Sequence, residues 1–204
     1  MSQLTFATVR APTPVADPKG AVYTPDSLAL AIARHVAPLV PVEDGHALRV
    51  IDPECGGGAF LRAARTVWPG CLTTGVDVDP TAAGLALADE GIVGDWPDLA
   101  EGMWDLGLQN PPFGQAVGMG VTIAHVRAAI TRCHVLATIL PAPYVTGNEF
   151  DEIIRVYPCA KVLRVVDRPW PKVLREVLVY VWRWSPDFGR DDSFRVETLD
   201  WRRT

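Results

Sequence analysis

The chain has 204 residues, of which 49% are apolar and 21% charged, a composition typical of one globular domain and too short for two full-sized ones. No apolar run reaches the ~20 residues of a membrane span and no secretory signal begins the chain, so we expect a cytoplasmic protein. The net charge of −5 argues weakly against a nucleic-acid partner.

Segments typical of helices and strands alternate along the chain after a flexible N-terminal arm at 1–20. In the first helix, Thr24 is a suitable N-cap and Pro25 suits the first turn. Hydrophobic periodicity and turn residues predict helices at 24–40, 58–68, 80–90, 122–134 and 148–157. They predict strands at 47–52, 71–77, 91–95, 105–110, 135–141, 162–167 and 176–184.

Repeated alternation of strands and helices predicts an α/β fold, with a mainly parallel seven-stranded sheet and helices on both faces. The last two predicted strands are joined by a short link, 168–175, which is typical of an antiparallel hairpin. We therefore expect a Rossmann-like single domain over 21–204. The four scattered cysteines contain no C-x-x-C pair, so we expect reduced thiols and no metal site.

Unusual residues follow four of the predicted strands. The first strand leads into the glycine turn "DPECGGGAF" (52–60), and the second ends on Asp77. The third ends on "GDW" (94–96) and the fourth on "NPPF" (110–113). Ligands of doubly wound sheets bind at the carboxyl ends of the strands, so these four segments predict one shared site.

The glycine turn and Asp77 suit a nucleoside ligand, because glycines allow close approach and an acid at this position can bind ribose hydroxyls. A dinucleotide is one candidate, but the turn lacks G-x-G-x-x-G, and the Asp52 carboxylate would repel a pyrophosphate. A ligand with ribose, adenine and a cationic amino-acid tail fits better. S-adenosylmethionine has these features.

The motifs "DPECGGGAF", "GVDVDP", "GDW" and "NPPF", in this order, resemble those of class I S-adenosylmethionine-dependent amino-methyltransferases, and most closely DNA adenine-N6 methyltransferases of the small phage-like or orphan type. "VYTPDSLALAIA" (22–33) resembles the N-terminal cofactor motif of such enzymes. The resemblance covers roughly residues 20–184. It implies a cofactor site made by Tyr23, Thr24, Pro25, Asp52, Cys55, Gly56, Gly58, Asp77, Asp95 and Trp96.

The resemblance also implies a catalytic segment made by Asn110, Pro111, Pro112 and Phe113. An exocyclic amine is a poor nucleophile because its lone pair is delocalised into the ring. The side-chain oxygen of Asn110 and the carbonyl of Pro111 would each accept one of its N–H groups, which frees the lone pair for attack on the methyl group. Phe113 would stack on the target ring, an adenine flipped out of the DNA duplex.

The substrate is less constrained than the reaction. Residues 1–110 carry 6 basic and 14 acidic side chains, whereas residues 111–204 carry 13 basic and 10 acidic ones. A basic cluster can bind phosphates, and we predict DNA contacts from Arg168, Lys172 and Arg175, although charge alone favours a solvated surface.

We expect no separate target-recognition domain, so target reading would fall to loops at 114–121, 142–148 and 168–175 or to a protein partner. Three alternatives remain open: methylation of a glutamine amide in a protein, methylation of a base amine in RNA, and a non-catalytic binding module with this fold.

Overall fold

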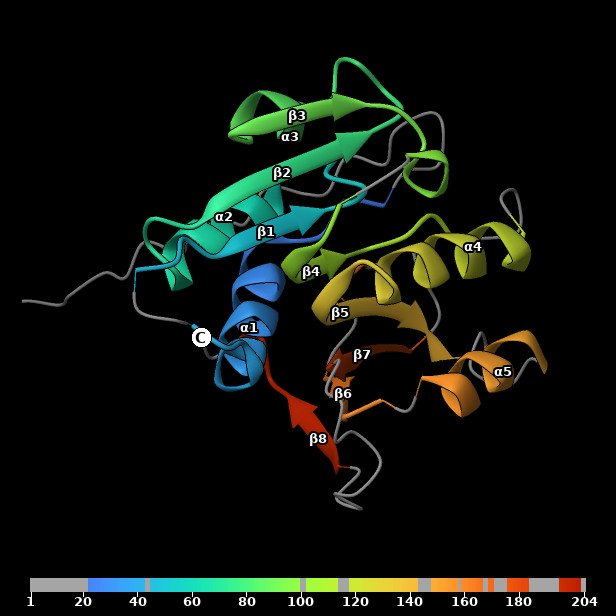
Figure 1. The fold of residues 1–204 in the computed structure, drawn as a ribbon. Helices are drawn as coiled ribbons and strands as arrows, with labels where there is room; N and C mark the ends of the chain where they lie inside the picture. The colour runs from blue at the N-terminus through green and yellow to red at the C-terminus, as the bar shows by residue number, and fades with distance from the viewer. Residues whose placement is uncertain are drawn as a thin grey trace, which may run out of the picture.

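The structure is a computed structural model that describes residues 22–42, 45–99, 102–113, 118–142, 148–157, 159–166, 169–170, 176–183 and 195–202. The predicted N-terminal arm, 1–20, lies outside these residues. The described chain forms one twisted sheet with helices on both faces (Figure 1). Within the described ranges, none of the helices combines the length and the apolar character that a membrane crossing requires.

The helices alternate with the strands, as the sequence predicts. The helices are α1 (Asp26–Val36), α2 (Ala59–Val67), α3 (Ala83–Leu87), α4 (Met119–Ile130) and α5 (Asn148–Val156), with short 3-10 turns η1 (Ala37–Leu39) and η2 (Trp96–Asp98). The strands are β1 (Arg49–Asp52), β2 (Leu72–Asp77), β3 (Glu90–Val93), β4 (Trp104–Gln109), β5 (Cys133–Pro141), β6 (Lys161–Val165), β7 (Val177–Arg183) and β8 (Arg195–Leu199).

The strand order is β3-β2-β1-β4-β5-β7-β6-β8. Strands β1 to β5 pair in parallel, whereas β7 lies antiparallel to both β5 and β6. The predicted α/β class, the mainly parallel sheet and the antiparallel C-terminal hairpin are therefore confirmed. The predicted number of strands is wrong by one, because the segment RVETL forms β8 and pairs in parallel with β6 at the edge of the sheet. This short segment offers little apolar alternation, so tertiary pairing decides its conformation.

Two helix boundaries differ from those that the sequence predicts. Helix α1 begins at Asp26 with Pro25 as its N-cap, so Thr24 is not the capping residue. The predicted helix 80–90 is reduced to the five residues of α3. Its expected last turn is extended instead, because the Asp89 carboxylate accepts the backbone N–H and the hydroxyl of Thr73, both at 2.8 Å.

Two apolar layers cover the sheet, as the alternation along β5 shows. Val135, Ala137 and Ile139 belong to the core that includes α1 and α2. Leu136 and Leu140 belong to the core that includes α4 and α5. All five side chains are at most 1% exposed, so β5 lies at the centre of a three-layer structure. The four cysteines, Cys55, Cys71, Cys133 and Cys159, are buried and unpaired.

The strand order reverses beside β1, which has β2 on one side and β4 on the other. A crevice forms at such a switch point, at the carboxyl ends of the strands. The residues that end these three strands or follow them are Asp52, Asp77 and Asn110. The fold thus brings three predicted site segments to one edge of the sheet.

Gly84 allows α3 to pack directly on the turn after β1, so we expect Gly84→Ala to destabilise the protein. Its N–H donates to the Gly56 carbonyl at 2.7 Å, and an added Cβ would lie 2.7 Å from the sulfur of Cys55. Overpacking of this kind costs about 1–3 kcal/mol of unfolding free energy, which urea denaturation would measure. The control is Gly120→Ala in α4, where an added Cβ meets open space. We expect it to leave stability unchanged or to raise it by up to ~1 kcal/mol, and equal losses in both variants would contradict this account of Gly84.

Candidate active site

The glycine turn after β1 forms the floor of the site. Gly56 and Gly58 have φ angles of 40° and 77°, in the left-handed region that favours glycine. The N–H of Gly58 donates to the Cys55 carbonyl at 2.6 Å, which closes the turn at the start of α2. An added Cβ at Gly58 would lie 2.6 Å from Leu87, so this position also lacks room for a side chain.

Asp77, at the end of β2, holds the glycine turn in place. One carboxylate oxygen accepts the N–H of Gly56 at 2.8 Å, and the other accepts the N–H of Asp79 at 2.9 Å. Each carboxylate oxygen has a second lone pair, so both can still accept a hydrogen bond from a ligand hydroxyl. The predicted ribose-binding acid is therefore oriented by the backbone before any ligand binds.

Asp52 is a buried carboxylate with one oxygen that has no hydrogen-bond donor among the described residues. Its residue is 2% exposed, and its Oδ1 is buried with no hydrogen-bond partner among the described residues. Burial, and then the charge of Glu54, raise the pKa of the Asp52 carboxyl well above its ordinary value. Burial likewise raises the pKa of the neighbouring Cys55 thiol, so this cysteine is not a nucleophile at neutral pH. A cationic ligand group would satisfy Asp52.

The side-chain amide of Asn110 is held in one orientation. Its Nδ2 donates to the carbonyl oxygen of Val22 at 2.8 Å, whereas its Oδ1 is buried with no hydrogen-bond partner among the described residues. Pro111, which follows, is buried, and the carbonyl of Pro112 accepts the Thr122 hydroxyl at 2.6 Å. The result is a rigid segment that presents one unsatisfied acceptor.

The segment before α1 joins the glycine turn to the NPPF segment. The ring of Tyr23 lies against Gly56, where an added Cβ would be 2.7 Å from the ring. The carbonyl of Tyr23 accepts the indole N–H of Trp170 at 2.7 Å, and Trp170 meets the ring of Phe113 edge-on at 6.4 Å. Thr24 and Pro25, the next two residues of the chain, are half-buried. Sequence reasoning did not identify Trp170.

Trp96, which the resemblance places in the cofactor site, is a residue of the hydrophobic core. The residue is 1% exposed, with the edge-on ring of Trp104 at 5.6 Å and the guanidinium of Arg132 at 4.9 Å from its centroid. Apolar packing against the sheet and the cation over the ring explain this burial. Asp95, the residue before it, keeps a side chain that is 50% exposed.

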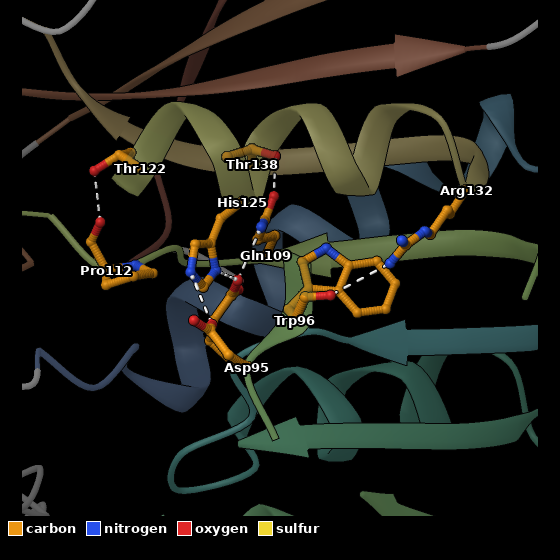
Figure 2. Close-up of polar contacts among 9 residues, drawn as sticks. Asp95, Trp96, Gln109, Pro112, Thr122, His125, Arg132 and Thr138 are labelled. Carbon is orange, nitrogen blue, oxygen red and sulfur yellow. Dashed lines mark hydrogen bonds and ion pairs between the residues drawn. The ribbon is translucent and has the colours of Figure 1, made fainter. Parts of the chain in front are cut away.

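A polar network that sequence reasoning missed lies behind the site (Figure 2). His125, in α4, contacts the Glu54 Oε1 through Nδ1 at 2.5 Å and the Asp95 Oδ1 through Nε2 at 3.2 Å. Gln109 donates to the same Glu54 oxygen at 3.0 Å and accepts the Thr138 hydroxyl at 3.0 Å. The position of Glu54 inside the glycine turn was a sequence signal that this residue lies near the site. No sequence pattern relates it to a histidine 71 residues away.

Comparisons with known proteins place this geometry in a known fold. No protein-family model matches the chain. The type II methyltransferase M.TthHB8I of Thermus thermophilus is 43% identical over 68 residues, which are 32% of this chain and 16% of that protein. A Listeria monocytogenes structure described as a class I S-adenosylmethionine-dependent methyltransferase superposes with a TM-score of 0.70 at 13% identity, over 89% of this chain and 68% of its own.

A type I restriction-modification methyltransferase subunit from Streptococcus thermophilus superposes with a TM-score of 0.61 at 15% identity, over 79% of this chain and 44% of its own. The chain has the class I methyltransferase fold. It also spans only about a sixth of the length of the curated Thermus protein.

The sequence predicts DNA contacts from Arg168, Lys172 and Arg175. These three residues lie outside the described residues. Two neighbouring basic residues are described and have acidic partners: Lys161 contacts Glu197 at 3.0 Å, and Arg164 pairs with Glu176. The predicted recognition loops are described only in part, at 118–121, 142, 148 and 169–170.

We expect Asp52→Asn to stabilise the ligand-free protein at pH 7. Because its pKa is raised on folding, the folded state disfavours the ionised carboxyl, and this cost applies above the ordinary carboxyl pKa and vanishes below it. The gain at pH 7 should disappear near pH 3, where the carboxyl is protonated in both the folded and the unfolded protein.

Urea unfolding at the two pH values would measure this difference. The matched control is Asp151→Asn, at an exposed position of α5, which should change stability little. A loss of stability in Asp52→Asn at pH 7 would contradict the argument.

Proposed function

We propose that this chain binds S-adenosylmethionine and transfers its methyl group to an exocyclic amino nitrogen, N6 of adenine in DNA. The observation that carries the proposal is the buried Oδ1 of Asn110, an unsatisfied acceptor fixed by the bond from its Nδ2 to Val22. An unpaired buried acceptor costs free energy, so a site that retains one is suited to a ligand donor.

The acidic edge of the sheet fits the charge of this cofactor. Asp52 ends β1, Asp77 ends β2 and Asp95 follows β3. The Oδ1 of Asp52 is buried with no hydrogen-bond donor among the described residues. The positive amino and sulfonium groups of S-adenosylmethionine suit Asp52, and its ribose hydroxyls suit Asp77. A pyrophosphate would meet repulsion at the same place. When bound, the cofactor supplies an electrophilic methyl group.

The chain itself contributes positioning and hydrogen-bond acceptors. Asn110 Oδ1 and the Pro111 carbonyl would accept the two N–H groups of the target amine, which weakens delocalisation of its lone pair into the ring. No strong base is required for this step, because the amine loses its proton only after it has gained the methyl group. Phe113 and Trp170 offer adjacent rings for a base that has left the DNA stack.

DNA is the favoured substrate for two reasons. The matched Thermus protein is a type II methyltransferase, and the Streptococcus structure is a subunit of a restriction-modification system. The NPPF segment adds a rigid pair of acceptors beside an aromatic ring, which suits a planar ring amine. A protein partner or further DNA-contacting loops would supply target recognition.

Transfer of a labelled methyl group to DNA, RNA and a protein mixture tests this proposal directly. Mass spectrometry of nucleosides from the treated DNA should detect N6-methyldeoxyadenosine. Label in a protein glutamine or in an RNA base would redirect the proposal to those substrates. Cofactor binding without transfer to any acceptor would favour a non-catalytic binding module.

We expect Asp77→Ala to weaken cofactor binding by about 1–3 kcal/mol, the usual cost of losing hydrogen bonds to a charged group. Calorimetry with S-adenosylmethionine would measure the change. Asp79→Ala removes a neighbouring acid that accepts from Thr81 and serves as the control, with an affinity close to that of the wild type. Heat with a nicotinamide dinucleotide but not with S-adenosylmethionine would overturn the cofactor assignment.

We expect Asn110→Ala to reduce methyl transfer by two or more orders of magnitude while cofactor affinity stays nearly intact, because the lost acceptor acts on the target amine. Asn110→Asp retains an acceptor oxygen but loses the donor to Val22, so it should keep more activity than the alanine variant. Single-turnover rates and calorimetry would separate the two effects. Unchanged turnover in Asn110→Ala would remove this residue from the mechanism.

A further inference from the structure

His125 joins two carboxylates from separate parts of the sheet. Its Nδ1 lies 2.5 Å from an oxygen of Glu54, in the glycine turn, and its Nε2 lies 3.2 Å from an oxygen of Asp95, after β3 (Figure 2). The imidazole side chain is only 6% exposed. The Nδ1 contact with Glu54 is a hydrogen bond, whereas the Nε2 contact with Asp95 is an ion pair that exists only while the imidazole is protonated. The geometry therefore fits an imidazolium bridge.

The surrounding charges favour that protonated form. Burial by itself lowers the pKa of His125, but the hydrogen bond and charge of Glu54, and the charges of Asp95 and Asp98, outweigh burial and raise it above the ordinary value. Burial raises the pKa of Glu54, whereas His125 and Gln109 lower it. The histidine thus supplies the positive charge that a buried glutamate requires.

The bridge rests on the same strands that carry the catalytic segment. The Oε1 of Glu54 also accepts from Gln109, whose side-chain oxygen accepts the hydroxyl of Thr138 in β5. Gln109 immediately precedes Asn110. Behind the site, the network therefore runs from β5 through β4 and the glycine turn to α4, and it reaches the site surface at the half-exposed Asp95.

We propose that His125 is a positioning residue that holds the Asp95 carboxylate ready to accept a hydrogen bond from the purine amine of the cofactor. This inference rests on the proposed function, since it names how one part of the cofactor is recognised. The other Asp95 oxygen is left to the ligand while Glu54 anchors the histidine to the glycine turn. Recognition of the purine amine is therefore coupled to the protonation of a residue that does not touch the cofactor.

The coupling has a defined direction with pH. Below the raised pKa of His125, the imidazole is positively charged and holds Asp95 through the ion pair at its Nε2. As the pH rises through that value, the imidazole becomes neutral and the ion pair with Asp95 is lost. Preference for a ligand with the purine amine should then fall, because a mobile carboxylate recognises it less well.

Calorimetry with two ligands tests this proposal: S-adenosylhomocysteine and its analogue with oxygen in place of the purine amine. The wild type should prefer the amine at least about tenfold at pH 6, and this preference should shrink by pH 9. His125→Gln should show a small preference that does not change with pH. His46→Gln is the matched control: His46 contacts Asp105 at 3.5 Å near the start of β4, at the opposite end of the strand, and should behave as the wild type.

A double-mutant cycle identifies the route of the effect. If His125 acts through Asp95, the variant carrying both Asp95→Asn and His125→Gln should discriminate no less than Asp95→Asn alone. Full, pH-dependent discrimination in His125→Gln, or additive losses in the double variant, would overturn the inference while leaving the proposed function intact. No binding of S-adenosylhomocysteine by the wild type would instead overturn the proposed function.

Nuclear magnetic resonance of nitrogen-labelled histidine in the wild type keeps the inference testable if His125→Gln does not fold. One imidazole should remain protonated on both nitrogens at pH 7 and titrate above the ordinary histidine range. The same resonance should be unaffected in His46→Gln. Protonation of His125 on a single nitrogen at pH 6, or a wild-type amine preference that is constant from pH 6 to 9, would overturn the bridge.

Discussion

Parallel pairing of β1 with β2 and β4 is the constraint on which the site depends. In this arrangement Asp52 lies opposite Gly75, and the next strand pair sets Asp77 opposite Val93. Because all these strands run in the same direction, their carboxyl ends bring acids and the NPPF segment to one edge. The absence of a side chain at Gly84 lets α3 approach this edge closely and bond to the turn at Gly56. The glycine turn and the sheet thus form a single rigid unit.

Several polar groups at this edge are retained at a cost in stability. Asp52 Oδ1, Glu54 Oε2 and Asn110 Oδ1 are buried without partners among the described residues. Glu54 is partly compensated by His125 and Gln109, whereas the raised pKa of Asp52 shows that its compensation is incomplete. Sites that stay complementary to a ligand commonly have such unsatisfied groups in the free protein. The network around His125 limits this cost by supplying one buried cation.

The segment before α1 gives the NPPF segment its geometry, although 88 residues separate the two. The carbonyl of Val22 fixes which way the Asn110 amide points, and the next carbonyl, of Tyr23, accepts from Trp170. One short stretch of chain therefore contacts the glycine turn, the Asn110 amide and the aromatic residue Trp170. These contacts explain physically why the N-terminal motif at 22–33 belongs to the same site as the glycine turn that follows it in the chain.

The sequence by itself determined the α/β class, the antiparallel hairpin and the identity of the strand-end segments, because periodicity, glycine turns and NPPF are local signals. Only the tertiary structure decided three features: the burial of Trp96 beneath Arg132, the early end of α3 and the pairing of β8 with β6. It also decided the contact of His125 with Glu54 and Asp95, and the bond that orients Asn110. These contacts join residues 16 to 88 positions apart in the chain. Local patterns contain no information on which distant side chains the packing of helices on a sheet will bring together.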